Sequence, residues 1–199
     1  MKQERRKSRG WLPLALGAAG LAAGVVIGGA WAVKEVELSS EWEIDTPAEK
    51  VFEALLNTGN YAEWWPQISA HSTPGGSRIS KATVVQAAMR LPLTLLPVAP
   101  TLHMTVRFPQ IERNLRIRAR LTGDVVGISE WMLVPQADGV VILKNNTRLR
   151  LANPLINLAV LALPESSWRG SLESLLLEAR AGLHRTLEYT EADLAVSRH

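Results

Sequence analysis

The spacing of apolar and polar residues divides the chain into three regions. Residues 11–33 contain no charged side chain over 23 positions. From residue 36 to about 151, short segments alternate between apolar and polar positions, which is the period of half-buried strands. In residues 166–190, apolar positions recur every three or four residues, as on one face of a long helix.

The first region predicts a transmembrane helix over residues 11–33. A helix rises about 1.5 Å per residue, so 23 residues can cross a hydrocarbon core about 30 Å thick. The preceding residues 1–10 form a basic tail, and excess positive charge favours the cytoplasmic side. The sequence therefore predicts a single-pass protein of the cell membrane, with a cytoplasmic N-terminus and the following domain on the outer face.

Other interpretations of this region stay open. Ala30-Trp31-Ala32 fits the small-x-small pattern of a signal-peptide cleavage site, so the protein could instead be secreted after cleavage. A buried helix of a soluble domain is a third reading. Gly20, Gly24 and Gly28 are spaced four apart and could form the contact of a homodimer, although small residues are common in membrane helices.

The segment after the apolar region predicts one strand followed by two short helices. Residues 36–44 alternate in polarity, and Thr46 then begins a T-x-x-E capping box that ends at Glu49. A short helix should follow and end near Asn57 to Asn60. A second helical turn should carry Trp64 and Trp65 and stop at Pro66.

Several further strands are predicted before the long helix. They lie within residues 82–89, 102–108, 114–121, 127–134 and 140–151, separated by turn signals. Alternation with short connections indicates an antiparallel sheet with one solvated face. The resulting class is α+β, in which a curved sheet packs against the C-terminal helix.

Composition narrows the partners and the chemistry. Residues 1–10 hold five of the 22 Lys and Arg residues and one of the 19 Asp and Glu residues. The remainder of the chain therefore has 17 basic and 18 acidic residues. A region so close to neutral gives no electrostatic reason to expect a nucleic-acid partner. The chain has no cysteine, and His71, His103, His184 and His199 have no metal-ligand spacing. We therefore expect no metal site and no cofactor.

The search for catalytic residues gives no convincing pair. Asp124 and Glu130 lie near one strand, and a carboxylate in an apolar cavity can have a raised pKa that suits proton transfer. Glu130, however, precedes Trp131 on that strand, so it faces water if Trp131 faces inward. No catalytic residue is assigned, and a binding protein is favoured over an enzyme.

Asn145 and Thr147 are the best polar candidates for contact with a ligand. They share one face of the last predicted strand with apolar residues, so burial requires that they be hydrogen bonded. Their partners could be a ligand carbonyl or hydroxyl, a water molecule, or each other. Two uncharged segments, 91–102 and 153–164, are expected to be buried core or apolar flaps that touch a lipid surface.

The order of motifs resembles the START-like, or SRPBCC, superfamily of polyketide cyclase/dehydrase and birch-pollen allergen proteins. EWEIDTPAEKVFEALLNTGNYAEWWPQI looks like its opening, GDVVGISEWML at 123–133 like its Gly-Asp-x-x-Gly strand, and GLHRTLE at 182–188 like its final helix. The resemblance covers residues 36–190 and leaves 191–199 as a tail. It implies a helix-grip fold around an apolar cavity for lipids, sterols, quinones or polyketides. The predicted anchor departs from most members.

The resemblance and the patterns together predict a membrane-anchored protein that binds a hydrophobic small molecule or lipid. A polyketide cyclase/dehydratase-like enzyme and an adaptor domain with a filled core are the alternatives. The residues expected to contact the ligand are Trp64, Trp65, Met104, Trp131, Leu143, Asn145, Thr147, Trp168, Leu172 and Leu176.

Overall fold

The computed structural model describes residues 35–73, 76–91 and 99–196. The predicted basic tail, the transmembrane helix over 11–33 and the glycines proposed for a homodimer lie outside these residues. Within the described ranges, no helix combines the length and the apolar character needed to cross a membrane.

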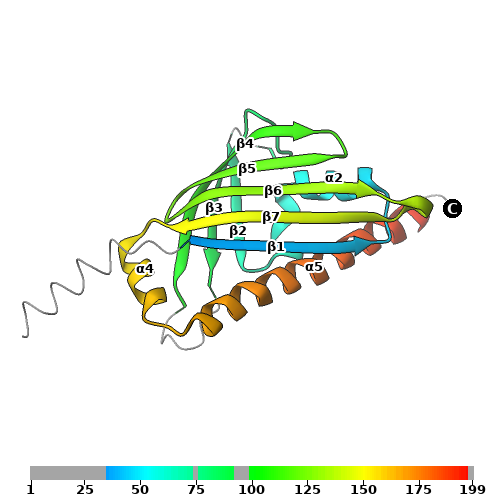
Figure 1. The fold of residues 1–199 in the computed structure, drawn as a ribbon. Coiled ribbons are helices and arrows are strands. Elements are labelled where there is room, and N and C mark those ends of the chain that lie inside the picture. The colour runs from blue at the N-terminus through cyan, green and yellow to red at the C-terminus, as the bar shows by residue number, and fades with distance from the viewer. Residues whose placement is uncertain (1–34, 74–75, 92–98, 197–199) are drawn as a thin grey trace, which may run out of the picture.

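The described residues form an antiparallel sheet with helices on one side (Figure 1). The strands are β1 (Glu35–Ile44), β2 (Ile68–Thr73), β3 (Val84–Arg90), β4 (Thr101–Glu112), β5 (Arg116–Gly123), β6 (Val125–Pro135) and β7 (Val141–Leu151). The α-helices are α2 (Ala48–Leu56), α3 (Tyr61–Trp64), α4 (Pro154–Leu161) and α5 (Glu165–Val196), with short 3₁₀ turns at Thr58–Asn60 and Ala137–Gly139.

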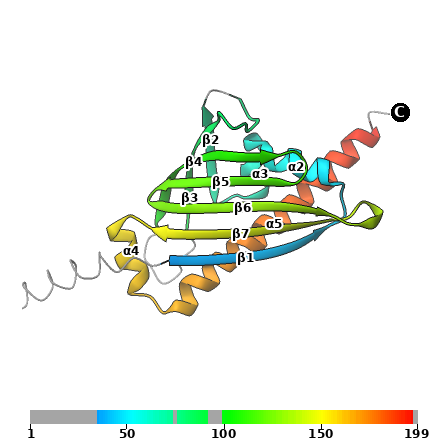
Figure 2. The same ribbon diagram turned by 45° about the horizontal axis from the view of Figure 1, so that its top comes forward.

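The sheet has the order β1-β7-β6-β5-β4-β3-β2, so β1 and β2 form its two edges. It curves around α5, which crosses it obliquely (Figures 1 and 2). The helices α2 and α3 pack near the C-terminal part of α5, and α4 lies at the other end of the molecule. The predicted α+β class, the antiparallel sheet and the long C-terminal helix are confirmed.

Alternation along the strands sets the inner and outer faces as predicted. On β5, Arg118 and Arg120 are exposed, whereas Ile117 and Ala119 are buried. The outer face also holds cross-strand ion pairs, such as Arg148 Nη2 with Glu37 Oε1 at 2.9 Å. These arginines thus belong to a solvated face whose charges are partly balanced.

One local prediction is wrong, and two elements of the structure were not predicted. The capping box is wrong: Thr46 Oγ1 donates to the Asp45 carbonyl oxygen at 2.7 Å, because α2 begins only at Ala48. The edge strand β2 was not predicted, since ISAHST has little apolar content. Most of the uncharged segment 153–164 forms a helix that was not predicted, α4, whose start is capped by the Asn153 side chain.

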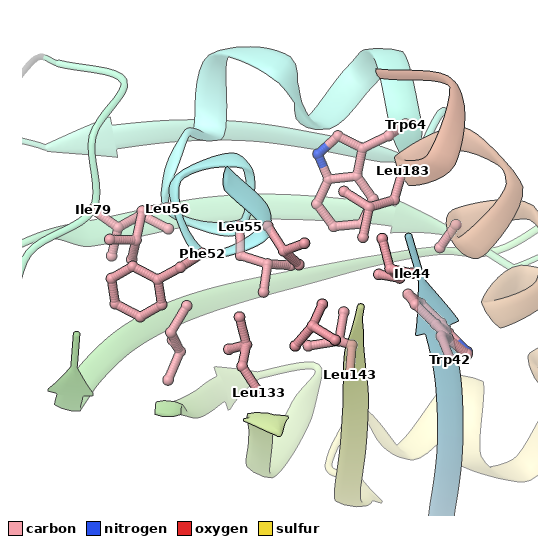
Figure 3. Close-up of a cluster of buried hydrophobic side chains, with 14 of the residues drawn as sticks. Trp42, Ile44, Phe52, Leu55, Leu56, Trp64, Ile79, Leu133, Leu143 and Leu183 are labelled. Atoms are coloured by element: carbon pink, nitrogen blue, oxygen red, sulfur yellow. The ribbon is translucent and has the colours of Figure 1, made fainter. Parts of the chain in front are cut away.

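The interior consists of two hydrophobic clusters. Figure 3 shows the larger one, where Phe52, Leu55 and Leu56 of α2 face Leu133 and Leu143 of the sheet. The smaller cluster lies between the sheet and the N-terminal half of α5, next to α4. It includes Val36, Met89, Met104, Val160 and Trp168.

Candidate functional site

A cavity of about 160 Å³ lies between the sheet, α3 and α5. Its walls combine residues from both hydrophobic clusters, for example Leu55 and Phe108 from the larger, and Met89 and Leu175 from the smaller. Strands β3 to β7 supply most of the remaining lining. The cavity is therefore the space that the side chains of the curved sheet and of the long helix leave unfilled between them.

The structure brings eight of the ten expected ligand contacts to this cavity. They are Trp64, Trp65, Met104, Trp131, Asn145, Thr147, Leu172 and Leu176. Leu143 is not among them, because its place on β7 lies under α2, where it is fully buried beside Leu133 (Figure 3). Trp168 lines a second cavity of about 40 Å³ next to Val160 of α4.

Tyr61 and Trp64 of α3, with Trp65 directly after it, form one part of the cavity wall. Trp64 is 1% exposed, and its ring centroid lies 5.6 Å from that of Trp65. Tyr61 packs edge-on against Trp64 at 5.1 Å. Such clusters bury a large apolar area and hold the rings in a defined geometry. Although α3 has only four residues, this packing keeps its aromatic rings in fixed positions on the cavity wall.

The position of α3 depends on Gly182 in α5. A Cβ atom at this position would lie 2.1 Å from the Trp64 carbonyl oxygen, so any larger residue requires the two helices to move apart. The sequence alone had singled out GLHRTLE only as a family-like ending. The structure explains its glycine as the point of closest approach between α5 and α3.

Trp131 forms another part of the wall, and its ring packs edge-on against the buried Trp42 at 5.4 Å. Glu130 lies on the opposite face of β6, 3.6 Å from Arg116 Nε. The inference that Glu130 faces away from the interior if Trp131 faces inward agrees with this arrangement. Glu130 therefore cannot act on a molecule in the cavity.

Three polar side chains interrupt the apolar lining. The Ser129 and Thr147 hydroxyl oxygens are 2.8 Å apart, and Thr147 donates to Asn145 Oδ1 at 3.1 Å. Asn145 Nδ2 donates to Ser129 Oγ at 3.3 Å and to the Glu130 carbonyl oxygen at 3.5 Å. We call Ser129, Asn145 and Thr147 the polar ring. Ser129 was not predicted, although it shares a strand face with Trp131.

Tyr61 is the one titratable side chain among the described residues that line the cavity. Its hydroxyl donates to the Leu55 carbonyl oxygen at 2.7 Å. Burial raises the pKa of the Tyr61 phenol well above its usual value, so the group stays protonated at neutral pH. Over the same described ranges, no cluster of three or more His, Asp or Glu residues could hold a metal ion.

Asp124 has a structural role beside the cavity. Its carboxylate accepts from the His103 backbone N–H and from the Asn153 amide, each at 2.8 Å, and its carbonyl oxygen accepts from the Ala152 N–H at 2.8 Å. The preceding Gly123 has φ +120°, and a Cβ there would lie 2.6 Å from the His103 carbonyl oxygen. The Gly-Asp pair thus joins β4, the β5–β6 turn and the start of α4.

This architecture agrees with a family comparison. Residues 35–183 match the family described as polyketide cyclase/dehydrase and lipid transport. The chain belongs to this family. The resemblance inferred from the sequence motifs is therefore confirmed for the domain. No curated protein matches the chain.

Solved structures from three other proteins have a similar fold. A START superfamily protein from Mycobacterium smegmatis has TM-score 0.55 and 16% identity, covering 77% of this chain and 98% of its own. The Zhui aromatase/cyclase from Streptomyces sp. R1128 has TM-score 0.57 and 14% identity, covering 78% and 94%. A conserved protein from Geobacillus kaustophilus has TM-score 0.60 and 10% identity, covering 78% and 97%. At these identities the likeness concerns the fold.

Proposed function

We propose that this protein binds a hydrophobic small molecule or lipid in the cavity between the sheet and α5. The observation that carries the proposal is a cavity of about 160 Å³ whose described lining is almost entirely apolar. A cavity of about 150 Å³ with apolar walls is large enough to hold benzene. Burial of each ligand methylene contributes about 0.8 kcal/mol, so useful affinity needs no charged group.

Two other functions have less support. An adaptor domain with a filled core is disfavoured because the interior contains this cavity. A cyclase/dehydratase-like enzyme fits the family description, and one similar structure is named an aromatase/cyclase. Such chemistry ordinarily uses a positioned acid or base. The described cavity lining offers only Tyr61, whose proton is held by the Leu55 carbonyl oxygen.

The proposal includes a membrane anchor at residues 11–33, which would place the domain on the outer face of the cell membrane. Its support is the uncharged stretch of 23 residues after a basic tail. Because β1 begins at Glu35, such an anchor would hold the domain close to the bilayer. Reporter fusions at each terminus in living cells distinguish this topology from secretion after cleavage. Crosslinking tests a homodimer through Gly20, Gly24 and Gly28.

Native mass spectrometry of the full chain, released from detergent micelles, tests the binding function. We expect a co-purifying hydrophobic mass that is removed by organic extraction and regained when the extract is added back. A chain that purifies empty and takes up no simple aromatic hydrocarbon would contradict the proposal.

A further inference from the structure

Each donor proton of the polar ring can be matched to an acceptor. Thr147 carries one hydroxyl proton, and the Asn145 Oδ1 that it meets at 3.1 Å can only accept. The 2.8 Å contact between Ser129 and Thr147 must then use the Ser129 proton. The two Asn145 amide protons point to Ser129 Oγ and the Glu130 carbonyl oxygen. All four protons are therefore used within the wall.

The Glu130 carbonyl oxygen fixes the direction of this ring. It can only accept a hydrogen bond, so it favours the Asn145 amide with Nδ2 facing it. A flipped amide would place Asn145 Oδ1 against the Glu130 carbonyl oxygen, and the two hydroxyls would have to turn, with Thr147 donating to Ser129 Oγ. The ring thus runs in one sense, from Ser129 to Thr147, from Thr147 to Asn145, and from Asn145 back to Ser129.

What the ring still offers to the cavity is acceptor capacity. Each of its three side-chain oxygens keeps a lone pair after the internal bonds are counted. Other donors of the described lining do not compensate for this. The Tyr61 hydroxyl is hydrogen bonded to the Leu55 carbonyl oxygen. The Trp64 and Trp65 indole nitrogens have no hydrogen-bond partner, but both atoms are buried with almost no accessible surface. The described lining contains no cation.

We infer that the cavity selects an apolar ligand that carries a neutral hydrogen-bond donor, such as an alcohol or a phenol. This inference rests on the proposed binding function and specifies its ligand class. A ketone or ether would set its oxygen against the lone pairs of the ring, and a carboxylate would also lose its hydration without a partner. The sequence pattern alone allows a ligand carbonyl as well as a ligand hydroxyl at Asn145 and Thr147.

The test is calorimetric titration of the full chain in detergent micelles with four related compounds. They are 2-naphthol, 2-methoxynaphthalene, 2-acetonaphthone and naphthalene. We expect 2-naphthol to bind about tenfold more tightly than the methyl ether, because a buried hydrogen bond is made in one case and an acceptor is left unpaired in the other. Each compound also partitions into the micelles, and it does so to the same extent for every variant. This contribution therefore cancels when the affinities of two variants for one compound are compared.

Thr147→Val is the informative variant because it keeps the shape and removes one acceptor and one proton. Whether Ser129 then turns or the Asn145 amide flips, at least one proton is left without an acceptor in the wall. We expect the preference for 2-naphthol to disappear and 2-acetonaphthone to bind more tightly than to the wild type. Thr147→Ser keeps the hydroxyl and should keep the preference.

The outcomes separate this inference from the binding proposal. If naphthalene and the ether bind as tightly as 2-naphthol, or if Thr147→Val leaves the order of affinities unchanged, the donor selection is wrong while the cavity remains a binding site. If none of the four compounds binds, the inference fails, and the proposed function fails with it if the chain also purifies without a hydrophobic mass.

Discussion

At the scale of single residues, Asp124 connects three segments that are distant in sequence. The His103 backbone N–H, followed by the Asn153 amide, holds the pKa of the Asp124 carboxyl below its usual value. A carboxyl whose pKa is lower in the folded state stabilises the fold above its unfolded pKa. That stabilisation is lost as the pH falls through the folded pKa.

We predict that Asp124→Asn lowers the free energy of unfolding by about 1–3 kcal/mol at pH 7, the range for hydrogen bonds to a charged group that is partly open to solvent. The difference from the wild type should shrink as the pH falls below about 4, because the wild-type carboxyl is then being protonated. Urea unfolding at pH 7 and at pH 3 measures both values.

Asp45→Asn serves as the matched control, since Asp45 is exposed beside the start of α2. It should change the free energy of unfolding by less than about 0.5 kcal/mol. An Asp124 variant as stable as this control at pH 7 would show that the carboxylate does not tie the three segments together.

The direction of single side chains was predictable where alternation was regular. The two-residue period placed Asn145 and Thr147 on one strand face with apolar residues, and Trp131 on the face opposite Glu130. The structure puts all three on the cavity wall. Leu143 shares the strand face of Asn145 and Thr147 but lies outside the cavity, because alternation gives the side of the sheet and not the distance along it. Ser129 gave no signal, since a single serine is common on either face of a strand.

At the scale of elements, the contact between α3 and α5 is specified by one glycine. We predict that Gly182→Ala destabilises the domain by about 1–3 kcal/mol, because its Cβ would meet the Trp64 backbone at 2.1 Å. It should also weaken ligand binding, since Trp64 lines the cavity. Thermal unfolding and calorimetry measure these two effects.

Gly170→Ala is the control on the same helix, as a Cβ there has no atom within 4 Å. Alanine favours a helix over glycine by about 0.5–1 kcal/mol, so this variant should be slightly more stable than the wild type. If the two substitutions changed the stability equally, helix propensity alone would explain both effects, and the close approach of Gly182 to α3 would have no role.

Elements were predictable where a period extended over many residues. The long helix and strands β3 to β7 were all indicated by their patterns. The prediction of a capping box at Thr46 was wrong because a matching tetrapeptide does not determine where the first helical turn begins. Strand β2 is held at the sheet edge by pairing with β3, a contact between segments that its own polar sequence does not reveal.

At the scale of the whole molecule, the order of elements predicted the fold class, and the family match confirms the domain. The existence of a cavity was expected only from the resemblance to START-like proteins. A cavity is a difference between the volume enclosed by the elements and the volume of their side chains, and no local pattern reports it. The second cavity, which Trp168 lines, was not foreseen for the same reason.

The central claim is that a ligand occupies the space between the sheet and α5. The most direct measurement compares naphthalene binding by Ala87→Phe and Ala88→Phe in the full chain. Ala87 lines the cavity, whereas Ala88, next to it on β3, points to the other face of the sheet. We predict that Ala87→Phe folds but loses at least tenfold in affinity because the ring fills the cavity, and that Ala88→Phe binds like the wild type. Undiminished binding by a folded Ala87→Phe variant would contradict the account.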